Sequence, residues 1–174
     1  MPRLILLGVG TAGSTRFAPA GLLVEYGHTH VGIDGGPGSE PPETVEAWLV
    51  RDEHDPLLPE LRRIARESVM AEPGLGAFAH GALHVEPREA GYRITIGHRS
   101  AVWAPEPGPL PPWAGDADLA FAGAVTAADV VEGARTAREL GVKRLVFARV
   151  GDALDRGEPP ASGEWGEEGR VYRI

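Results

Sequence analysis

The sequence predicts an α/β fold in which sheets pack into a sandwich and helices lie on the outside. Short apolar runs bounded by glycine or proline occur in both halves of the chain, and such runs are typical of strands. Two longer segments, 58–72 and 126–141, have helical features and lie between the strand-like runs. No repeat at a solenoid period and no linker interrupts the 174 residues, so we expect a single domain over residues 1–174.

The first half of the chain is expected to contain strands and turns before one helix. Three strand-like runs come first, and at least two of them should form a hairpin: RLILLGVG, GLLVEYG and HTHVGIDGG. The segment ETVEAWLV predicts a helical turn that leads into a strand. The segment 58–72 has apolar residues at helical spacing and charged residues on the opposite side. Pro73 and Gly74 end this helix.

The second half is expected to return to strands around one well-marked helix. Three strand-like segments are separated by turns: FAHGALHVEP, GYRITIG and SAVWAPEPG. A proline-rich loop at 107–118 then precedes a buried strand, DLAFAGA. Thr126 is expected to cap the amino terminus of the helix and Gly141 to end it. The run KRLVFARV predicts a further strand, and the tail is expected to be a loop with one short last strand.

Composition limits the classes of function. The chain has no cysteine, so any metal ion must be held by His, Asp or Glu. Seventeen basic and twenty-five acidic residues give a net charge of −8, which opposes binding to a phosphate backbone. The apolar run at the amino terminus is too short to span a membrane. We therefore expect a cytoplasmic protein with no nucleic-acid or membrane partner.

A glycine motif follows the first strand-like run. The segment from Gly8 to Gly13 matches the pattern G-x-G-x-x-G, and Asp34 lies about twenty residues further on, as in dinucleotide-binding proteins. That pattern also needs a helix directly after the third glycine, to hold the pyrophosphate. Pro19 and Gly21 lie within the required helix, and an interior proline alone costs about 3 kcal/mol. We expect a tight turn here and keep dinucleotide binding as the least favoured alternative.

An Asp/His-rich segment follows the fourth strand-like run. The apolar residues 47–50 deliver a polar cluster to their carboxyl end, where side chains can converge on an ion. The cluster consists of Asp52, Glu53, His54 and Asp55. Proline and leucine then occupy positions 56 and 57, where further ligands would be needed. The segment therefore has the frame of a metal-binding turn with part of the ligands missing.

Several segments occur in the order found in one family. The strand ends LGVGTAGSTR, GLLVEYG and IDGGPGS, followed by the Asp/His-rich turn, resemble the opening of metallo-β-lactamase-fold proteins of the ribonuclease Z or cyclic phosphodiesterase type. Two later segments are similar to the parts of that family that carry its remaining ligands: ALHVEPREAGYRITIGHRSAVWAPEPGPLP and GARTARELGVKRLVFARVG. The resemblance covers nearly the whole chain and implies a compact αββα sandwich.

The resemblance assigns the family's metal ligands to individual positions. At the family's His-x-His-x-Asp-His turn it places Asp52, His54, Pro56 and Leu57. It places the third histidine at His84, the bridging aspartate at Glu106, the last histidine at Arg149 and a supporting aspartate at Asp34. One metal position is thereby implied to persist, formed by Asp52, His54, His84 and Glu106, with a donor set that suits one zinc, manganese or iron ion. The second position has lost its own ligands.

These substitutions leave two hypotheses besides dinucleotide binding. In the first, a single-metal hydrolase acts on an ester or phosphodiester of a small molecule, and Arg149 stabilises the developing negative charge. In the second, the site is catalytically silent and holds no metal: His54 and His84 are ordinary solvated or hydrogen-bonded histidines, and Arg149 pairs with Glu106 or Asp34. A silent protein would use the old cleft or an oligomer surface for binding. Two-metal activity is not expected, because the family's proton-accepting aspartate is replaced.

Overall fold

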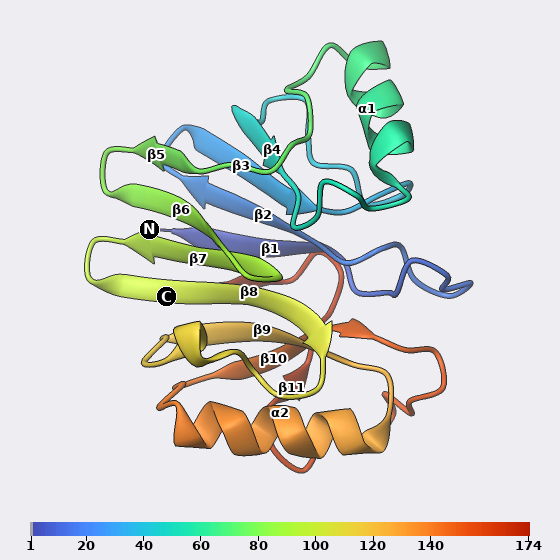
Figure 1. Cartoon of the computed structure of the whole chain (residues 1–174), viewed down its shortest axis with the longest axis vertical. Coiled ribbons are helices and arrows are strands. Elements are labelled where there is room, and N and C mark those ends of the chain that lie inside the picture. Colours follow the sequence, from blue (N-terminus) through green and yellow to red (C-terminus); the bar gives the residue numbers. More distant parts are fainter. Residues whose placement is uncertain (1) are drawn as a thin grey trace.

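The computed structural model, which describes residues 2–174, places the apolar runs of the amino-terminal third in one sheet. This five-stranded sheet has the order β12-β1-β2-β3-β4 (Figure 1). Neighbouring strands are antiparallel except for β3 and β4, which are parallel. The strands are β1 (Arg3–Gly8), β2 (Gly21–Tyr26), β3 (Thr29–Asp34), β4 (Ala47–Leu49) and β12 (Val171–Tyr172).

The second sheet has seven strands in the order β11-β10-β9-β8-β7-β6-β5. Strands β5 to β8 form an antiparallel meander, whereas β8, β9, β10 and β11 run parallel. The strands are β5 (Phe78–His80), β6 (Leu83–Arg88), β7 (Gly91–Ile96), β8 (Arg99–Pro107), β9 (Leu119–Ala124), β10 (Leu145–Val150) and β11 (Glu164–Trp165). A short 3-10 turn, η1 (Pro112–Ala114), interrupts the proline-rich loop after β8.

The main core lies between the two sheets. Alternate residues of each strand point to opposite faces, so every second side chain of β1, β2, β6 and β7 is buried in this layer. The largest fully buried side chains of this core include Tyr92, Trp103, Phe121 and Tyr172. The ring of Phe121 packs edge-on against Tyr172, with 5.4 Å between the centroids. Apolar burial of this size is the main force that holds the two sheets together.

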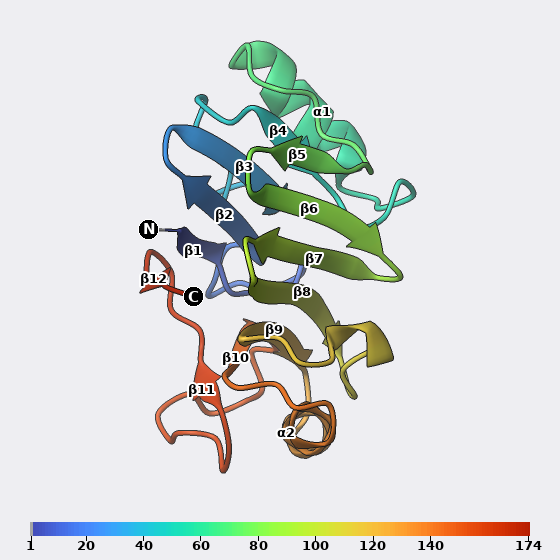
Figure 2. The ribbon, with the colours of Figure 1, turned by 90° about the vertical axis from the view of Figure 1, so that its left-hand side faces the viewer.

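One helix lies against the outer face of each sheet, at opposite ends of the molecule (Figures 1 and 2). Helix α2 (Ala127–Glu139) packs on β9 and β10 through a cluster that includes Val130, Ala134 and Phe147. Helix α1 (Leu58–Glu67) packs on Trp48, whose neighbour Leu49 points into the main core. The predicted sandwich with outer helices is therefore confirmed.

The structure also refines several predicted elements. The segment 78–87, read as one strand, is the hairpin β5–β6, and the tail contains two short strands instead of one. No helix precedes β4, and α1 ends five residues earlier than the predicted segment 58–72. Thr126 is the amino-terminal cap of α2, as predicted, and it also forms a reciprocal capping box with Asp129. Across residues 2–174, neither helix is long and apolar enough to cross a membrane.

Candidate functional site

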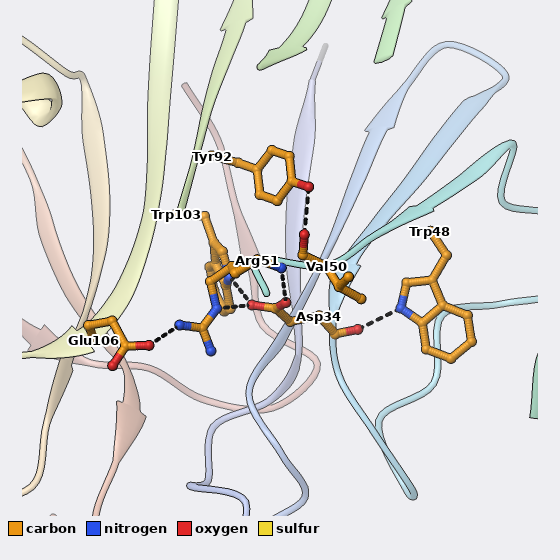
Figure 3. Close-up of polar contacts among 7 residues, drawn as sticks. All are labelled: Asp34, Trp48, Val50, Arg51, Tyr92, Trp103 and Glu106. Carbon is orange, nitrogen blue, oxygen red and sulfur yellow. Dashed lines mark hydrogen bonds and ion pairs between the residues drawn. The ribbon is translucent and has the colours of Figure 1, made fainter. Parts of the chain in front are cut away.

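The candidate site lies where β3, β4, β8 and β10 end at one edge of the sandwich. Arg51 lies two residues beyond the end of β4, and two hydrogen bonds hold the backbone of the preceding residue, Val50. The hydroxyl of buried Tyr92 donates a hydrogen bond of 2.7 Å to the carbonyl of Val50, and the Val50 N–H donates to the carbonyl of Gly74 at 3.0 Å. These bonds from a core tyrosine and a neighbouring loop hold the strand end in place, so Arg51 emerges at a fixed point (Figure 3).

Asp34, the last residue of β3, collects four hydrogen bonds (Figure 3). Its carboxylate accepts from the backbone N–H of Arg51 at 3.1 Å, from the Arg51 side chain, and from the indole N–H of Trp103 at 2.8 Å. Its backbone carbonyl accepts from the indole N–H of Trp48 at 2.7 Å. The φ of Asp34 is 54°, a left-handed conformation that aspartate tolerates better than most residues. The network keeps Asp34 in this unusual conformation and aims its carboxylate at Arg51.

Arg51 joins Asp34 to Glu106 across the two sheets. Its Nε donates to Asp34 and its Nη1 donates to Glu106, which lies near the end of β8. The side chain of Arg51 is 15% exposed and that of Asp34 12%, whereas Glu106 is 55% exposed. Burial alone would lower the pKa of Arg51, but the two carboxylates outweigh burial and raise it above its ordinary value. The guanidinium is therefore a permanent, buried positive charge at the centre of the site.

Arg149 contributes a second positive charge at the same edge. It is half-buried near the end of β10, and it lines a cavity of about 350 Å³ together with Arg51, Asp52, Asp55 and Glu106. Within residues 2–174, no carboxylate oxygen lies within 4.0 Å of a guanidinium nitrogen of Arg149, so Arg149 forms no ion pair. The cavity thus contains an unpaired guanidinium and three carboxylates that do not pair with it.

The comparisons with solved structures identify the architecture in which this site lies. No family model and no curated protein matches the sequence. The metallo-β-lactamase fold protein YhfI from Bacillus subtilis is 15% identical with a TM-score of 0.73, over 98% of each chain. The chain has the metallo-β-lactamase fold. A diphosphatase from the PhnP family is 16% identical with a TM-score of 0.71, over 98% of this chain and 96% of that one. Zinc-bound PqqB from Methylobacterium extorquens is 12% identical with a TM-score of 0.69, over 99% and 100%.

In this metallo-β-lactamase fold, Asp52 and Glu106 line the same cavity, but the other two expected ligands, His54 and His84, do not join them. His84 lies on β6 between Leu83 and Val85, which both point into the core, so its side chain points to solvent on the outer face. His54 is exposed in the loop after β4, where its backbone N–H donates a hydrogen bond of 2.8 Å to the carboxylate of Asp52. Residues 2–174 contain no group of three or more His, Asp or Glu side chains placed to hold a metal ion. The donor set in the structure does not fit a resident metal.

Arg149 does not form the ion pair that one of the two hypotheses assigns to it. The ion pair expected between Arg149 and Glu106 or Asp34 is formed by Arg51 instead. Asp34 does support the site from behind, because it orients Arg51 through both the backbone and the side chain. Two of the carboxylates that the resemblance places at the site, Asp34 and Glu106, are thus joined by a cation that it does not assign.

The sequence contained one signal for Arg51. If the turn pattern His-x-His-x-Asp-His begins at Arg51, one residue earlier than the register used above, its aspartate falls on Asp55. In this register Arg51 and Asp55 line the cavity and Glu53 is exposed, whereas in the other register Asp52 lines the cavity and His54 is exposed. In the earlier register, Arg51 carried no role and Pro56 stood at the aspartate position. Residues of both registers reach the cavity, so the turn after β4 does not single out one alignment.

The dinucleotide alternative lacks its main structural element. Residues 11–20 form turns and a single bridge, with no helix after Gly13. Gly8 and Gly10 serve close packing instead: a Cβ at Gly8 would lie 2.2 Å from the carbonyl oxygen of Pro19, and one at Gly10 would lie 2.6 Å from that of Phe17. A Cβ at Gly13 would meet no atom within 4 Å, so this glycine has no helix to accommodate. The motif leads into turns between β1 and β2 instead of a helix, as Pro19 and Gly21 predicted.

Proposed function

We propose that this protein binds a small molecule in the cleft between Arg51 and Arg149, without a resident metal ion and without hydrolysing the ligand. The observation that carries this proposal is the bonding of Arg51 to both Asp34 and Glu106. Glu106 is the carboxylate that the resemblance assigns to the metal bridge. Its hydrogen bond to a guanidinium occupies an oxygen that a metal ion would need.

The charge of Arg51 also argues against a cation at this place. A guanidinium stays protonated in proteins and repels a metal ion that approaches the same carboxylates. If a metal ion displaced Arg51 from these carboxylates, the Arg51 guanidinium would be buried without a partner, which costs several kcal/mol. The site is thus stabilised by an internal ion pair at the place where hydrolases of this fold hold metal ions. This supports the silent hypothesis over the single-metal hydrolase.

The volume and the charge of the cavity favour a binding role for the cleft. The cavity next to Arg149 has a volume of about 350 Å³, within the range of small-molecule sites. The net charge of −8 and the three carboxylates around the cavity oppose a nucleic-acid ligand. The expected ligand is therefore small and is recognised by polar groups that face the cavity.

The experiment that tests this proposal measures the metal content of protein purified without chelator. Zinc, manganese and iron are determined before and after incubation with each ion, and hydrolysis of ester and phosphodiester substrates is assayed on the same samples. We expect far less than one equivalent of metal and no turnover. The matched variant is the double substitution His54→Ala, His84→Ala. About one equivalent in the parent that disappears in this variant would instead establish the single-metal hydrolase.

A further inference from the structure

We infer that the cleft recognises a zwitterion, a small molecule with one carboxylate and one ammonium group, such as an amino acid. This inference rests on the proposed metal-free binding function and specifies its ligand class. Its basis is the separation of charge in one cavity. Arg149 lies on its wall without an ion pair, and Asp52, Asp55 and Glu106 line the same space.

The positive part of the cavity consists of two guanidinium groups with unused donors. Arg149 has all of its donors available, because no hydrogen bond or ion pair within residues 2–174 engages its side chain. Arg51 uses Nε and Nη1 for Asp34 and Glu106, and its Nη2 makes no bond to any of the residues drawn in Figure 3. A planar carboxylate matches the fork of a guanidinium and forms strong charge-assisted bonds with it.

The negative part of the cavity requires a positively charged group on the ligand. Asp52 and Asp55 each use one carboxylate oxygen to accept a backbone N–H of their own loop, from His54 and Leu57 at 2.8 Å in both cases. Their remaining oxygens and the second oxygen of the half-exposed Glu106 carboxylate are free to accept bonds from an ammonium group. These three negative charges would repel a diphosphate or a nucleotide. They would attract a ligand that carries a positive charge opposite its carboxylate.

A chemically matched set of ligands tests the inference by calorimetric titration of the metal-free protein at low ionic strength. The zwitterions are glycine, beta-alanine and gamma-aminobutyrate, which place the two charges at increasing separation. Butyrate and butylamine each keep one charge of gamma-aminobutyrate. We expect at least one zwitterion to bind, with each single-charge analogue binding at least about tenfold more weakly than gamma-aminobutyrate or not at all.

Variants then assign the two ends of the ligand. Arg149→Gln should weaken zwitterion binding about tenfold or more, and Arg149→Lys should restore part of it. Asp52→Asn and Asp55→Asn keep the oxygen that caps the loop and remove only the charge, so they should weaken the same ligand without unfolding the protein. Arg66→Gln removes an exposed arginine outside the cavity and should leave binding unchanged. Thermal unfolding of each variant confirms that it is folded.

Several results would overturn the inference. Absence of binding by all three zwitterions at millimolar concentration would exclude this ligand class, while a metal-free and inactive protein would leave the proposed function in place. Equal affinity for butyrate and gamma-aminobutyrate would show that the cleft recognises only the carboxylate. Unchanged affinity in Arg149→Gln would place the ligand elsewhere. Stoichiometric metal in the same sample would instead overturn the proposed function itself.

Discussion

The carboxylate of Asp34 accepts hydrogen bonds from both the backbone and the side chain of Arg51. The two residues lie at the ends of parallel neighbouring strands, β3 and just after β4, so the sheet itself brings them together. Both side chains are largely buried. Solved structures of this fold include a diphosphatase and a zinc-bound protein, and in this chain an ion pair joins the two strand ends. The stability of the site should therefore depend on charge balance within the chain.

Replacing Arg51 should destabilise the protein strongly. Arg51→Met leaves the carboxylate of Asp34 buried without a charged partner, and we expect the free energy of unfolding to fall by about 3–5 kcal/mol. Arg51→Lys keeps the charge but cannot form the forked contact to two carboxylates, so its loss should be smaller but measurable. Urea unfolding followed by tryptophan fluorescence measures both. The exposed Arg66→Met is the control, and a similar loss in that variant would refute the role of the ion pair.

Tyr92 should make the fold sensitive to alkaline pH. Burial, the largest cause, raises the pKa of Tyr92 to about 12, while an unfolded tyrosine titrates near 10. Because the folded pKa is raised, the stabilising contribution is complete below about pH 10 and is lost as the pH rises through about 12. A shift of this size corresponds to about 2–3 kcal/mol. Unfolding free energies measured across this range should decrease with pH.

The variant Tyr92→Phe isolates this contribution. It removes the ionisable group and also the hydrogen bond to the carbonyl of Val50, so it should be less stable at neutral pH by about 1–3 kcal/mol. Its decline above pH 10 should be shallower than that of the parent. Part of the decline should persist, because burial also raises the pKa of Tyr172. An identical alkaline slope in the parent and in Tyr92→Phe would contradict the assignment to Tyr92.

The fold could be predicted largely because its strands are short, apolar and separated by glycine-rich turns. The regions of β1, β2, β3, β7 and β9 follow directly from this pattern. The hairpin β5–β6 was missed because Gly81 and Ala82 lie inside a continuous strand-like segment. Gly81 has a φ of 58°, which allows the tight turn. Pairing of short strands at the chain terminus, as in β11 and β12, depends on distant partners and leaves little local pattern.

The site was predictable in position but not in composition. The resemblance placed Asp34, Glu106 and Arg149 at one edge, and all three lie at strand ends there. It placed His54 and His84 there as well, but both are exposed outside the cavity. For His84 the error has a geometric cause: side chains alternate between the two faces of β6, and those of Leu83 and Val85 point into the core. In the turn after β4 the degenerate motif leaves the alignment open, and the structure places Arg51, Asp52 and Asp55 together on the cavity wall.

The capping box of α2 gives a prediction for a region far from the cleft. The Thr126 hydroxyl accepts from the N–H of Asp129, whose carboxylate accepts from the N–H of Thr126 in return. Thr126→Ala should lower the free energy of unfolding by about 1 kcal/mol, because a helix donor loses its partner. Thr44→Ala, in an exposed turn, is the matched control. Chemical denaturation compares the two, and equal stabilities would show that the cap contributes nothing.

Gly123 on β9 determines how β8 presents Glu106. A Cβ at Gly123 would lie 2.0 Å from the carbonyl oxygen of Pro105, next to the point where the β8–β9 register shifts. Gly123→Ala must therefore displace the backbone beside Glu106, and overpacking of this kind costs about 1–3 kcal/mol. Gly13→Ala is the control, since a Cβ there meets no atom within 4 Å. If unfolding shows equal stability for the two variants, the close approach of β8 and β9 does not constrain the strand end that carries Glu106.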